Sequence, residues 1–145
     1  MANFTLTSTD YGWHGVFRAM ASPCELLLQP CSQTLAQHLV SLAYHEAQRI
    51  EAKYSRYRTD SVLSQLNLHA GAAQKIDSET AALLAFAAHC YRLSDGMFDI
   101  SSGVLRRVWQ FDGSDNLPHP DAVAALLPLI GFDKVQFDEQ HLWLP

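Results

Sequence analysis

The sequence lacks a long hydrophobic run and lacks a hydrophobic leader. No stretch reaches the roughly 18 apolar residues that a membrane-spanning helix requires. The first 15 residues, "MANFTLTSTDYGWHG", include Asp10 and have no apolar centre, so they do not resemble a signal peptide. As written, the sequence predicts a cytoplasmic protein without a membrane span.

Cysteine pairs with the spacing of a metal or redox site are also missing. Cys24, Cys31 and Cys90 form an odd set with no C-x-x-C pair, which argues against a zinc site and against a complete disulfide framework. The histidines are scattered, and His38 and His45 lie too far apart to bind one metal ion without other ligands. No metal ligand is therefore predicted.

Basic charge is scarce, because 10 Lys and Arg residues face 15 Asp and Glu residues and give a net charge of −5. Nucleic-acid binding needs a basic face, so this balance argues against it. The sequence also has no glycine-rich phosphate loop, nucleophile elbow or His-Glu-x-x-His helix. The basic residues that are present cluster in "RIEAKYSRYR" and "RR", which suits one small anionic ligand better than a duplex.

The chain has enough apolar residues for one globular core, with 145 residues that are 48% apolar and 17% charged. Residues 1–14 are expected to form a loose N-terminal extension. Residues 15–29 predict two strands separated by a break at Ser22 and Pro23, because proline cannot donate to a strand ladder. Together with the helices that follow, this order of elements is typical of an α+β fold.

A long amphipathic helix is predicted over residues 32–53, with Ser32 or Thr34 as its N-cap. Its inward face is expected to consist of Leu35, Leu39, Leu42, Ala43, Glu46, Ala47 and Ile50. A loop follows over 54–71, with a helical turn capped by Asp60 or Ser61, and then an extended piece at 74–79. A second helix is predicted over 79–94, capped by Asp77 or Ser78 and ended by Gly96, and a third over 101–111, capped by Ser101. A helix from Pro120 that ends by Gly131 and two short strands in 134–145 complete the chain. The last strand, "HLWLP", would leave an apolar edge uncovered, and a homo-oligomer is one expected way to cover it.

Aromatic and basic side chains alternate directly after the long helix, at Tyr54, Arg56, Tyr57 and Arg58. Such rings can stack on a planar ligand, and arginine can pair with phosphate. The alternative is that the tyrosines pack on the end of the helix and the arginines remain solvated.

A second candidate segment, "SDGMFDIS", has an apolar centre between two predicted helices. Gly96 permits a positive φ and a close backbone approach to a ligand, and Asp99 could accept a hydrogen bond from that ligand. The alternative is a helix stop followed by a helix cap, with Met97 and Phe98 in the core.

Four blocks of the sequence, taken together, resemble the ApbE family of FAD:protein FMN transferases, formerly called thiamine biosynthesis lipoproteins. The blocks are "FRAMASPCELLL", "AQRIEAKYSRYRTDSVLSQLN", "IDSETAALLAFAAHCYRLSDGMFDISSGVLRRVWQF" and "LIGFDKVQFDEQHLWLP". They occur in the family's order and cover the chain from about Val16 onward. The resemblance implies an α+β, T-fold-like domain, of which residues 1–145 would be the N-terminal part.

The resemblance also implies a reaction. Members of the family bind FAD as a substrate, use Mg²⁺, and transfer FMN to a threonine or serine hydroxyl of a target flavoprotein with release of AMP. Positioning and charge neutralisation dominate catalysis of this type. FAD and a target flavoprotein are therefore the expected partners, and family members are often periplasmic inner-membrane lipoproteins.

Five flavin-contact residues carry over by position, while the catalytic residues stay unassigned. The family's "F-x-x-M-G-T" block places Met20, its "S-x-Y-x-x-D-S" block places Tyr57, and its "G-x-F-D" loop places Met97, Phe98 and Asp99.

The sequence departs from the family pattern in two respects. Ala21 and Ser22 replace the usual Gly and Thr after Met20. The glycine-rich "D-L-G-G-I-x-K-G" segment and the later Asp and Thr that bind magnesium are absent from these 145 residues. The isolated chain is therefore expected to be inactive as a transferase, and the alternative function is a non-catalytic flavin-binding or protein-interaction remnant of the family.

Overall fold

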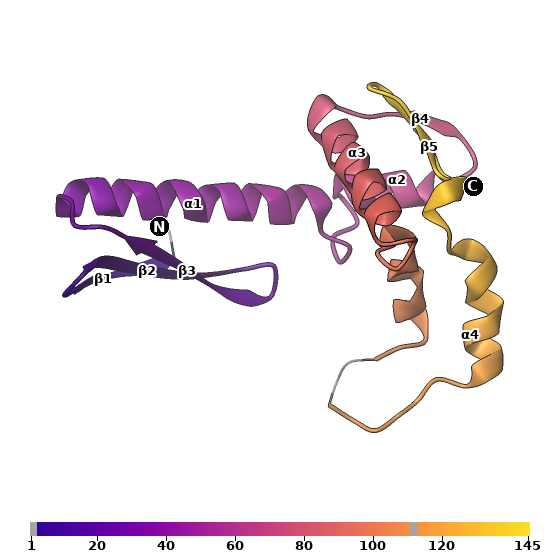
Figure 1. Ribbon diagram of the computed structural model, residues 1–145, viewed down its shortest axis with the longest axis horizontal. Helices are drawn as coiled ribbons and strands as arrows, with labels where there is room; N and C mark the ends of the chain where they lie inside the picture. The colour runs from indigo at the N-terminus through magenta and orange to yellow at the C-terminus, as the bar shows by residue number, and fades with distance from the viewer. Residues whose placement is uncertain (1–2, 111–112) are drawn as a thin grey trace. The chain divides into compact units, whose positions relative to one another are not determined.

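The computed structural model describes residues 3–110 and 113–145, and its internal contacts divide the chain into two units, Met1–Leu68 and His69–Pro145. Both units combine helices with a small antiparallel sheet (Figure 1), so the α+β prediction is confirmed. The expectation that residues 1–145 belong to a single domain stays a prediction.

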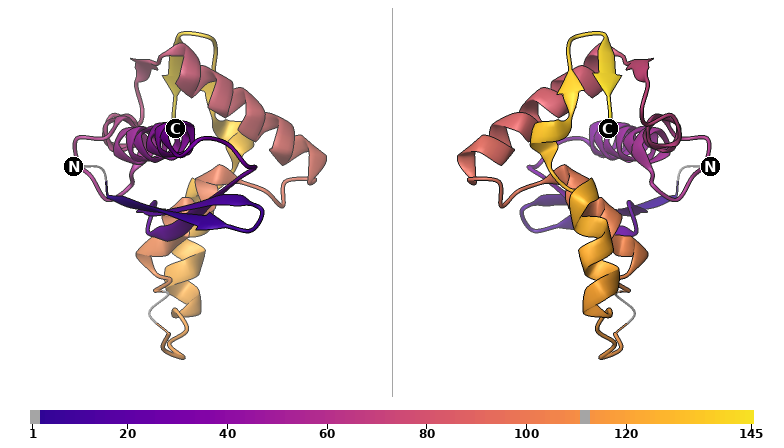
Figure 2. Two further views of the ribbon diagram at one scale, coloured as in Figure 1. Left: turned by 90° about the vertical axis from the view of Figure 1, so that its left-hand side faces the viewer. Right: turned by 90° about the vertical axis from the view of Figure 1, so that its right-hand side faces the viewer.

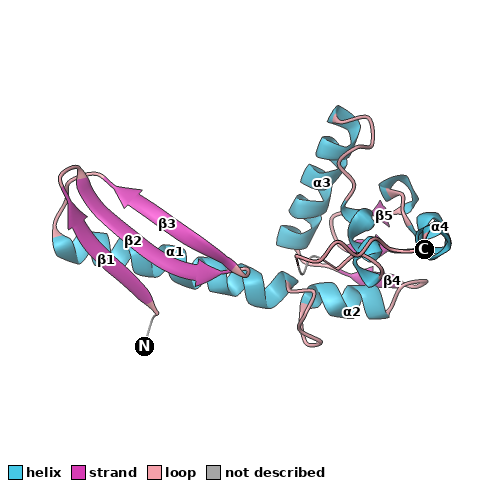
Figure 3. Cartoon of the chain, turned by 90° about the horizontal axis from the view of Figure 1, so that it is seen from below, coloured by secondary structure: helices cyan, strands magenta, loops and turns pink. Residues whose placement is uncertain are grey.

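Unit 1 is a three-stranded antiparallel sheet with a long helix along one face (Figure 3). Its elements are β1 (Phe4–Thr9), β2 (Gly12–Ala19), β3 (Ser22–Leu28), α1 (Gln33–Tyr54) and α2 (Val62–Leu68). The core forms where Phe17 and Ala19 of β2 meet Val40 of α1. Partly buried side chains complete it, namely Phe4, Leu6, Cys24, Leu26, Leu28, Ala43, Tyr44 and Ala47.

The prediction of a loose extension over residues 1–14 is wrong. Residues 4–9 form β1, which pairs along its whole length with β2 and places Phe4 opposite Phe17. Apolar and threonine residues alternate in "FTLTST", so Phe4 and Leu6 pack on the core while the threonines face away. This two-residue period was the signal of a half-buried strand.

The break between β2 and β3 lies at Met20 and Ala21 rather than at Ser22 and Pro23. Pro23 is tolerated within β3 because β3 is an edge strand, where a missing N–H costs little. Met20 and Ala21 have φ angles of 52° and 60°. The type I′ form of a two-residue hairpin turn requires positive φ at both central positions. Residues such as methionine and alanine adopt that conformation only with strain.

Helix α1 begins after Ser32, whose Oγ accepts a hydrogen bond from the N–H of Leu35 at 3.3 Å, as predicted. Ala43 and Ala47 pack on the core as predicted, but the buried residues of the helix, Ala36 and Val40, were not on the predicted face. The exposed side chains include three that were expected inside, Leu35, Leu39 and Leu42. Val40 faces Gly15 of β2, where a Cβ would lie only 2.4 Å from Val40 Cγ2. The absent glycine side chain thus lets this face of the helix approach the sheet.

Unit 2 contains the remaining elements. They are β4 (Ala73–Lys75), α3 (Ser78–Leu93), η1 (Ile100–Arg107), α4 (Pro120–Leu126), η2 (Leu127–Leu129), η3 (Phe132–Lys134), β5 (Gln136–Phe137) and β6 (His141–Trp143). The three strands form one antiparallel sheet in the order β4-β6-β5. The hairpin of β5 and β6 near the C-terminus is drawn in yellow in Figure 2. The last strand is therefore central and Leu142 is buried, so the predicted uncovered edge at "HLWLP" is wrong. The reason for expecting a homo-oligomer disappears with it.

The helix ends of unit 2 largely follow the sequence signals. Asp77 caps α3 by accepting a hydrogen bond from the N–H of Thr80 at 2.9 Å, and the N–H of Gly96 donates to the carbonyl of Tyr91 at 2.9 Å. The helix expected over 101–111 is a 3₁₀ helix capped by Asp99 rather than Ser101. Its expected end at Phe111 lies outside the described residues.

Gly15→Ala should lower the free energy of unfolding by about 1–3 kcal/mol, because the new methyl group overpacks the contact with Val40. Urea denaturation measures the change. The double variant Gly15→Ala/Val40→Ala should lose clearly less stability than the sum of the two single variants. Additive losses would contradict the close approach of helix and sheet.

Ala21→Gly should raise the free energy of unfolding by roughly 0.5–1 kcal/mol, because relief of the strained φ exceeds the added entropy of the unfolded chain. Ala52→Gly on the exposed side of α1 is the matched control, and it should lower the free energy of unfolding by about 1 kcal/mol. Equal losses in both variants would show that Ala21 is not strained.

Candidate functional site

The first predicted flavin contact, Met20, lies exposed at the tip of the β2–β3 hairpin. Helix α1 holds this end of the hairpin, since Gln48 Nε2 donates to the carbonyl of Arg18 at 3.0 Å. The tip therefore lies beside the C-terminal half of α1, the half that leads into the segment carrying Tyr57.

Tyr57 lies in the loop between α1 and α2, and α2 holds this loop in place. The buried Ser61 donates from Oγ to the carbonyl of Ser55 at 2.6 Å and accepts from the N–H of Ser64 at 3.0 Å, so it is the cap of α2. Gln65 Nε2 donates to the carbonyl of Thr59 at 2.8 Å. Tyr57 itself is 76% exposed, so its ring is not buried against the end of the helix. The positioning roles of Ser61 and Gln65 were missed in the sequence, where only the cap signal was visible.

Arg58 was a candidate phosphate ligand, but its guanidinium is engaged by a neighbour. Its Nη2 and Nε donate to the two carboxylate oxygens of Asp60 at 2.7 and 3.0 Å. This hydrogen-bonded pair lowers the pKa of Asp60. A phosphate would have to displace Asp60 to use the same two N–H groups.

The segment 94–99 reverses the chain after α3 and presents two apolar side chains to solvent. Asp95 and Gly96 have φ angles of 49° and 81°. Ser94 then fixes the loop, because its carbonyl accepts from the N–H of Met97 at 3.0 Å and its Oγ accepts from the N–H of Phe98 at 2.8 Å. Met97 is 89% exposed and Phe98 is 49% exposed, so the alternative that placed them in the core is wrong.

Asp99 caps the helix that follows and also bonds to a distant segment. Its Oδ1 accepts from the N–H of Ser101 at 2.8 Å and from the hydroxyl of Ser101 at 2.6 Å. Its Oδ2 accepts from the N–H of Phe132 at 3.1 Å. The helix-cap alternative for Asp99 is therefore correct, and both carboxylate oxygens have partners within the chain.

The predicted flavin contacts divide between the two units, with Met20 and Tyr57 in unit 1 and Met97, Phe98 and Asp99 in unit 2. The backbone is strained in two of the candidate segments, at Met20 and in the loop 94–99. In the described part of the chain, the non-glycine residues with positive φ are Met20, Ala21 and Asp95, and all lie in or beside these segments. Strain of this kind clusters at functional sites, which makes these turns candidate ligand-binding segments.

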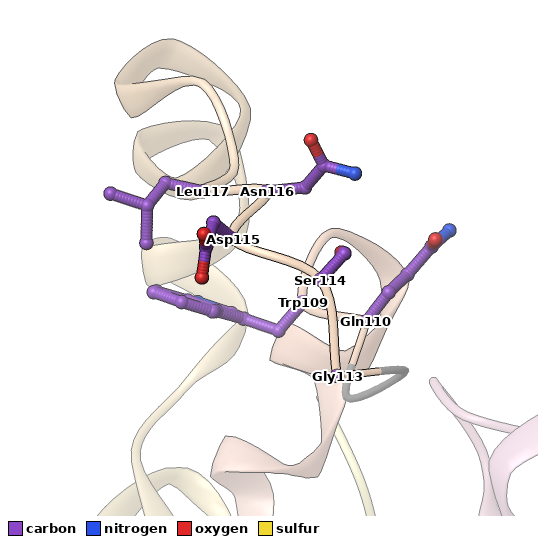
Figure 4. A pocket seen from close by; sticks show the side chains of 7 residues that line it. All are labelled: Trp109, Gln110, Gly113, Ser114, Asp115, Asn116 and Leu117. Atoms are coloured by element: carbon purple, nitrogen blue, oxygen red, sulfur yellow. The ribbon is translucent and has the colours of Figure 1, made fainter.

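Unit 2 also has an open pocket of about 580 Å³ that the sequence did not reveal. Figure 4 shows the Trp109 ring below the side chains of Asp115 and Leu117. The lining residues are Trp109, Gln110, Gly113, Ser114, Asp115, Asn116 and Leu117. None of the predicted flavin contacts is among them.

The expected magnesium ion finds no ligand set in the described residues. Within residues 3–110 and 113–145, no group of three or more His, Cys, Asp or Glu side chains could hold a metal ion. The cysteines Cys24, Cys31 and Cys90 are free thiols. Within the same described ranges, no helix has both the length and the apolarity needed to cross a bilayer.

Arg58→Ala should raise the pKa of Asp60 toward the ordinary value for an aspartate, since the hydrogen bond that lowers it is lost. Because the folded pKa is depressed, this pair stabilises the protein above the unfolded pKa, and that contribution is lost as pH falls through the folded pKa. Carboxyl ¹³C NMR titration measures the change. Asp138, whose pKa is lowered by the N–H groups of Gln140 and His141, is the internal control and should titrate unchanged. An unaltered Asp60 titration would contradict the pairing.

Comparison with known proteins identifies the family. Residues 20–145 match the model of the ApbE family. Three similar solved structures are the ApbE protein of Thermotoga maritima, the apo flavinyl transferase ApbE of Pseudomonas stutzeri, and a mutant of the flavin transferase ApbE of Vibrio cholerae. Their sequence identities are 24%, 18% and 20%, and their TM-scores are 0.78, 0.66 and 0.71.

These similarities show the fold, and they cover only part of each neighbouring structure. The alignments cover 93%, 98% and 90% of this chain but 45%, 46% and 44% of the three neighbours, so the chain spans less than half of their length. No curated protein matches significantly. The family match extends over most of the sequence and confirms the resemblance of the four motif blocks. The chain therefore belongs to the ApbE family.

Proposed function

We propose that this chain supplies part of the FAD site of an FAD:protein FMN transferase. The observation that carries the proposal is the loop 94–99, which displays Met97 and Phe98 to solvent on a backbone held by Ser94. Exposed apolar side chains on a hydrogen-bonded loop are suited to cover a planar ring system. Family membership supports a flavin as this ring system, because the similar structures include flavin transferases.

In this proposal the residues of the chain bind and orient the flavin nucleotide. Unit 2 offers the ring of Phe98 for stacking and Met97 as an adaptable apolar contact. Unit 1 by itself offers the ring of Tyr57 and the side chain of Met20. The transfer breaks the pyrophosphate of FAD and joins FMN to a threonine or serine hydroxyl of a target flavoprotein, with AMP as the leaving group. The described residues do not fit a magnesium ion, so no step of the reaction is assigned to a metal here.

The energy available from these contacts is modest. Covering one exposed methionine or phenylalanine side chain contributes about 1.5–3 kcal/mol, before the cost of immobilising the ligand is subtracted. The hydrogen-bonded loops reduce that cost because they need little ordering on binding. We therefore expect the 145-residue chain to bind FAD weakly, with a Kd of about 1 μM or higher.

The test is a titration of the 145-residue chain with FAD, followed by flavin fluorescence and tryptophan quenching, with and without Mg²⁺. Tyr57→Ala and Phe98→Ala should each weaken binding roughly tenfold, since each removes a stacking ring. The matched controls are Tyr11→Ala and Leu27→Ala, which truncate side chains that are 87% and 78% exposed outside the candidate segments. Both controls should bind FAD as the parent chain does.

Each other result has a definite meaning. Equal losses in Tyr57→Ala and Tyr11→Ala, or no saturable binding, would refute the proposal for this chain, and sub-micromolar binding would refute the expectation of a weak site. A magnesium effect would reveal a metal ligand set that the described residues do not show. Saturable FAD binding without transfer to a target flavoprotein would favour the non-catalytic flavin-binding alternative.

A further inference from the structure

We infer that Asp99 is a positioning residue that fixes the Met97–Phe98 loop to the turn at Gly131 and Phe132. The inference rests on the proposed function, because it concerns how the candidate flavin loop is held. The four residues that make the connection, Asp99, Ser101, Gly131 and Phe132, are called the clamp below.

The clamp consists of two parallel links between segments about 30 residues apart in sequence. Asp99 Oδ2 accepts a hydrogen bond from the N–H of Phe132 at 3.1 Å. Ser101 Oγ accepts from the N–H of Gly131 at 2.8 Å. The hydroxyl of Ser101 also donates to Asp99 Oδ1 at 2.6 Å, so the two links are joined to each other. Consecutive backbone amides of the turn are thus bound by a carboxylate and by the hydroxyl that this carboxylate orients.

The turn is a firm attachment point because it belongs to the core of unit 2. Phe132 is buried, and its ring lies 5.9 Å from the ring of Tyr91 on α3 and 6.3 Å from the ring of Phe137 on β5. Gly131 has a φ of 138°, and a Cβ at this position would lie 2.7 Å from Asp133 Oδ1. The turn is therefore held in place by the packing of Phe132.

The opposite end of the loop is attached to α3. Ser94 accepts hydrogen bonds from the N–H groups of Met97 and Phe98, and the N–H of Gly96 donates to the carbonyl of Tyr91. Met97 and Phe98 lie between these two attachments with largely exposed side chains, so packing does little to hold them. The clamp then determines where the loop presents its apolar side chains.

Two conservative variants separate the clamp from a simple helix cap. Asp99→Asn keeps one carbonyl oxygen for the cap but replaces the other oxygen with an amino group that cannot accept from Phe132. Ser101→Ala removes the hydroxyl between Asp99 and Gly131. Asp138→Ala is the matched control, because Asp138 also accepts from two backbone N–H groups, each at 2.7 Å, in a turn of the same unit.

The first readout is amide hydrogen exchange, measured by NMR in the full 145-residue chain. Variants and parent chain are compared under conditions that give them the same free energy of unfolding. Both clamp variants should speed exchange of the Phe98 amide roughly tenfold, as loss of a hydrogen bond to a charged group implies. The Asp138→Ala control should leave that amide unchanged. Unchanged exchange at Phe98 in Ser101→Ala and Asp99→Asn would overturn the inference.

FAD affinity in a double-mutant cycle is the second readout, and it distinguishes positioning from direct contact. Positioning predicts that Asp99→Asn and Ser101→Ala each weaken FAD binding by about tenfold and that the double variant is no weaker than either. Loss of affinity in Asp99→Asn alone would show direct contact and overturn the inference, as would faster loop exchange with unchanged affinity. If the parent chain binds no FAD, the proposed function fails, and the exchange measurement alone decides whether the clamp holds the loop.

Discussion

Hydrogen bonds from side chains to the backbone are the interactions on which the candidate site depends. Met97, Phe98 and Tyr57 are exposed, so burial cannot determine their positions. Ser94 and Asp99 hold one loop, and Ser61 holds the other. Each of these bonds satisfies a backbone group that would otherwise have no regular partner, because loops lack the repeating ladders of helices and sheets. An apolar surface can therefore remain open to a ligand without leaving the loop unordered.

The hairpin tip at Met20 shows a different solution to the same requirement. Its two non-glycine residues have positive φ, and the regular pairing of β2 with β3 maintains this strained turn. The sheet is in turn held by α1, which approaches closely because Gly15 has no side chain opposite Val40. Packing in the core of unit 1 thus stabilises the strained tip. Ala21, where the family pattern has glycine, raises the strain energy that this packing must offset.

The sequence predicted the elements better than it predicted their faces and ends. Cap residues act through local geometry, so Ser32 and Asp77 located their helices correctly. The inward face of α1 was predicted only in part, at Ala43 and Ala47. Apolar residues occur on more than one side of the helix, and the choice between them depends on a glycine in a distant strand. The turn at Met20 was misplaced because proline is the stronger local signal, although an edge strand tolerates it.

The candidate site was predictable only as a set of segments. The motif resemblance marked Met20, Tyr57 and the loop 97–99. The structure shows that Met20, Tyr57, Met97 and Phe98 are exposed, and that the backbone is strained at Met20 and at Asp95. The partners that hold them, such as Gln65 and Phe132, could not be found from spacing, because their bonds join positions that no local pattern relates.

For Asp99 the two competing interpretations, ligand contact and helix cap, turn out to be separable in space. The cap uses Oδ1, which accepts from Ser101, while Oδ2 reaches the N–H of Phe132 in a buried part of unit 2. A residue that only capped η1 would not need this second bond. The geometry of Asp99 therefore goes beyond a helix cap, and it is the geometry expected of a residue that acts on a ligand through the backbone it holds.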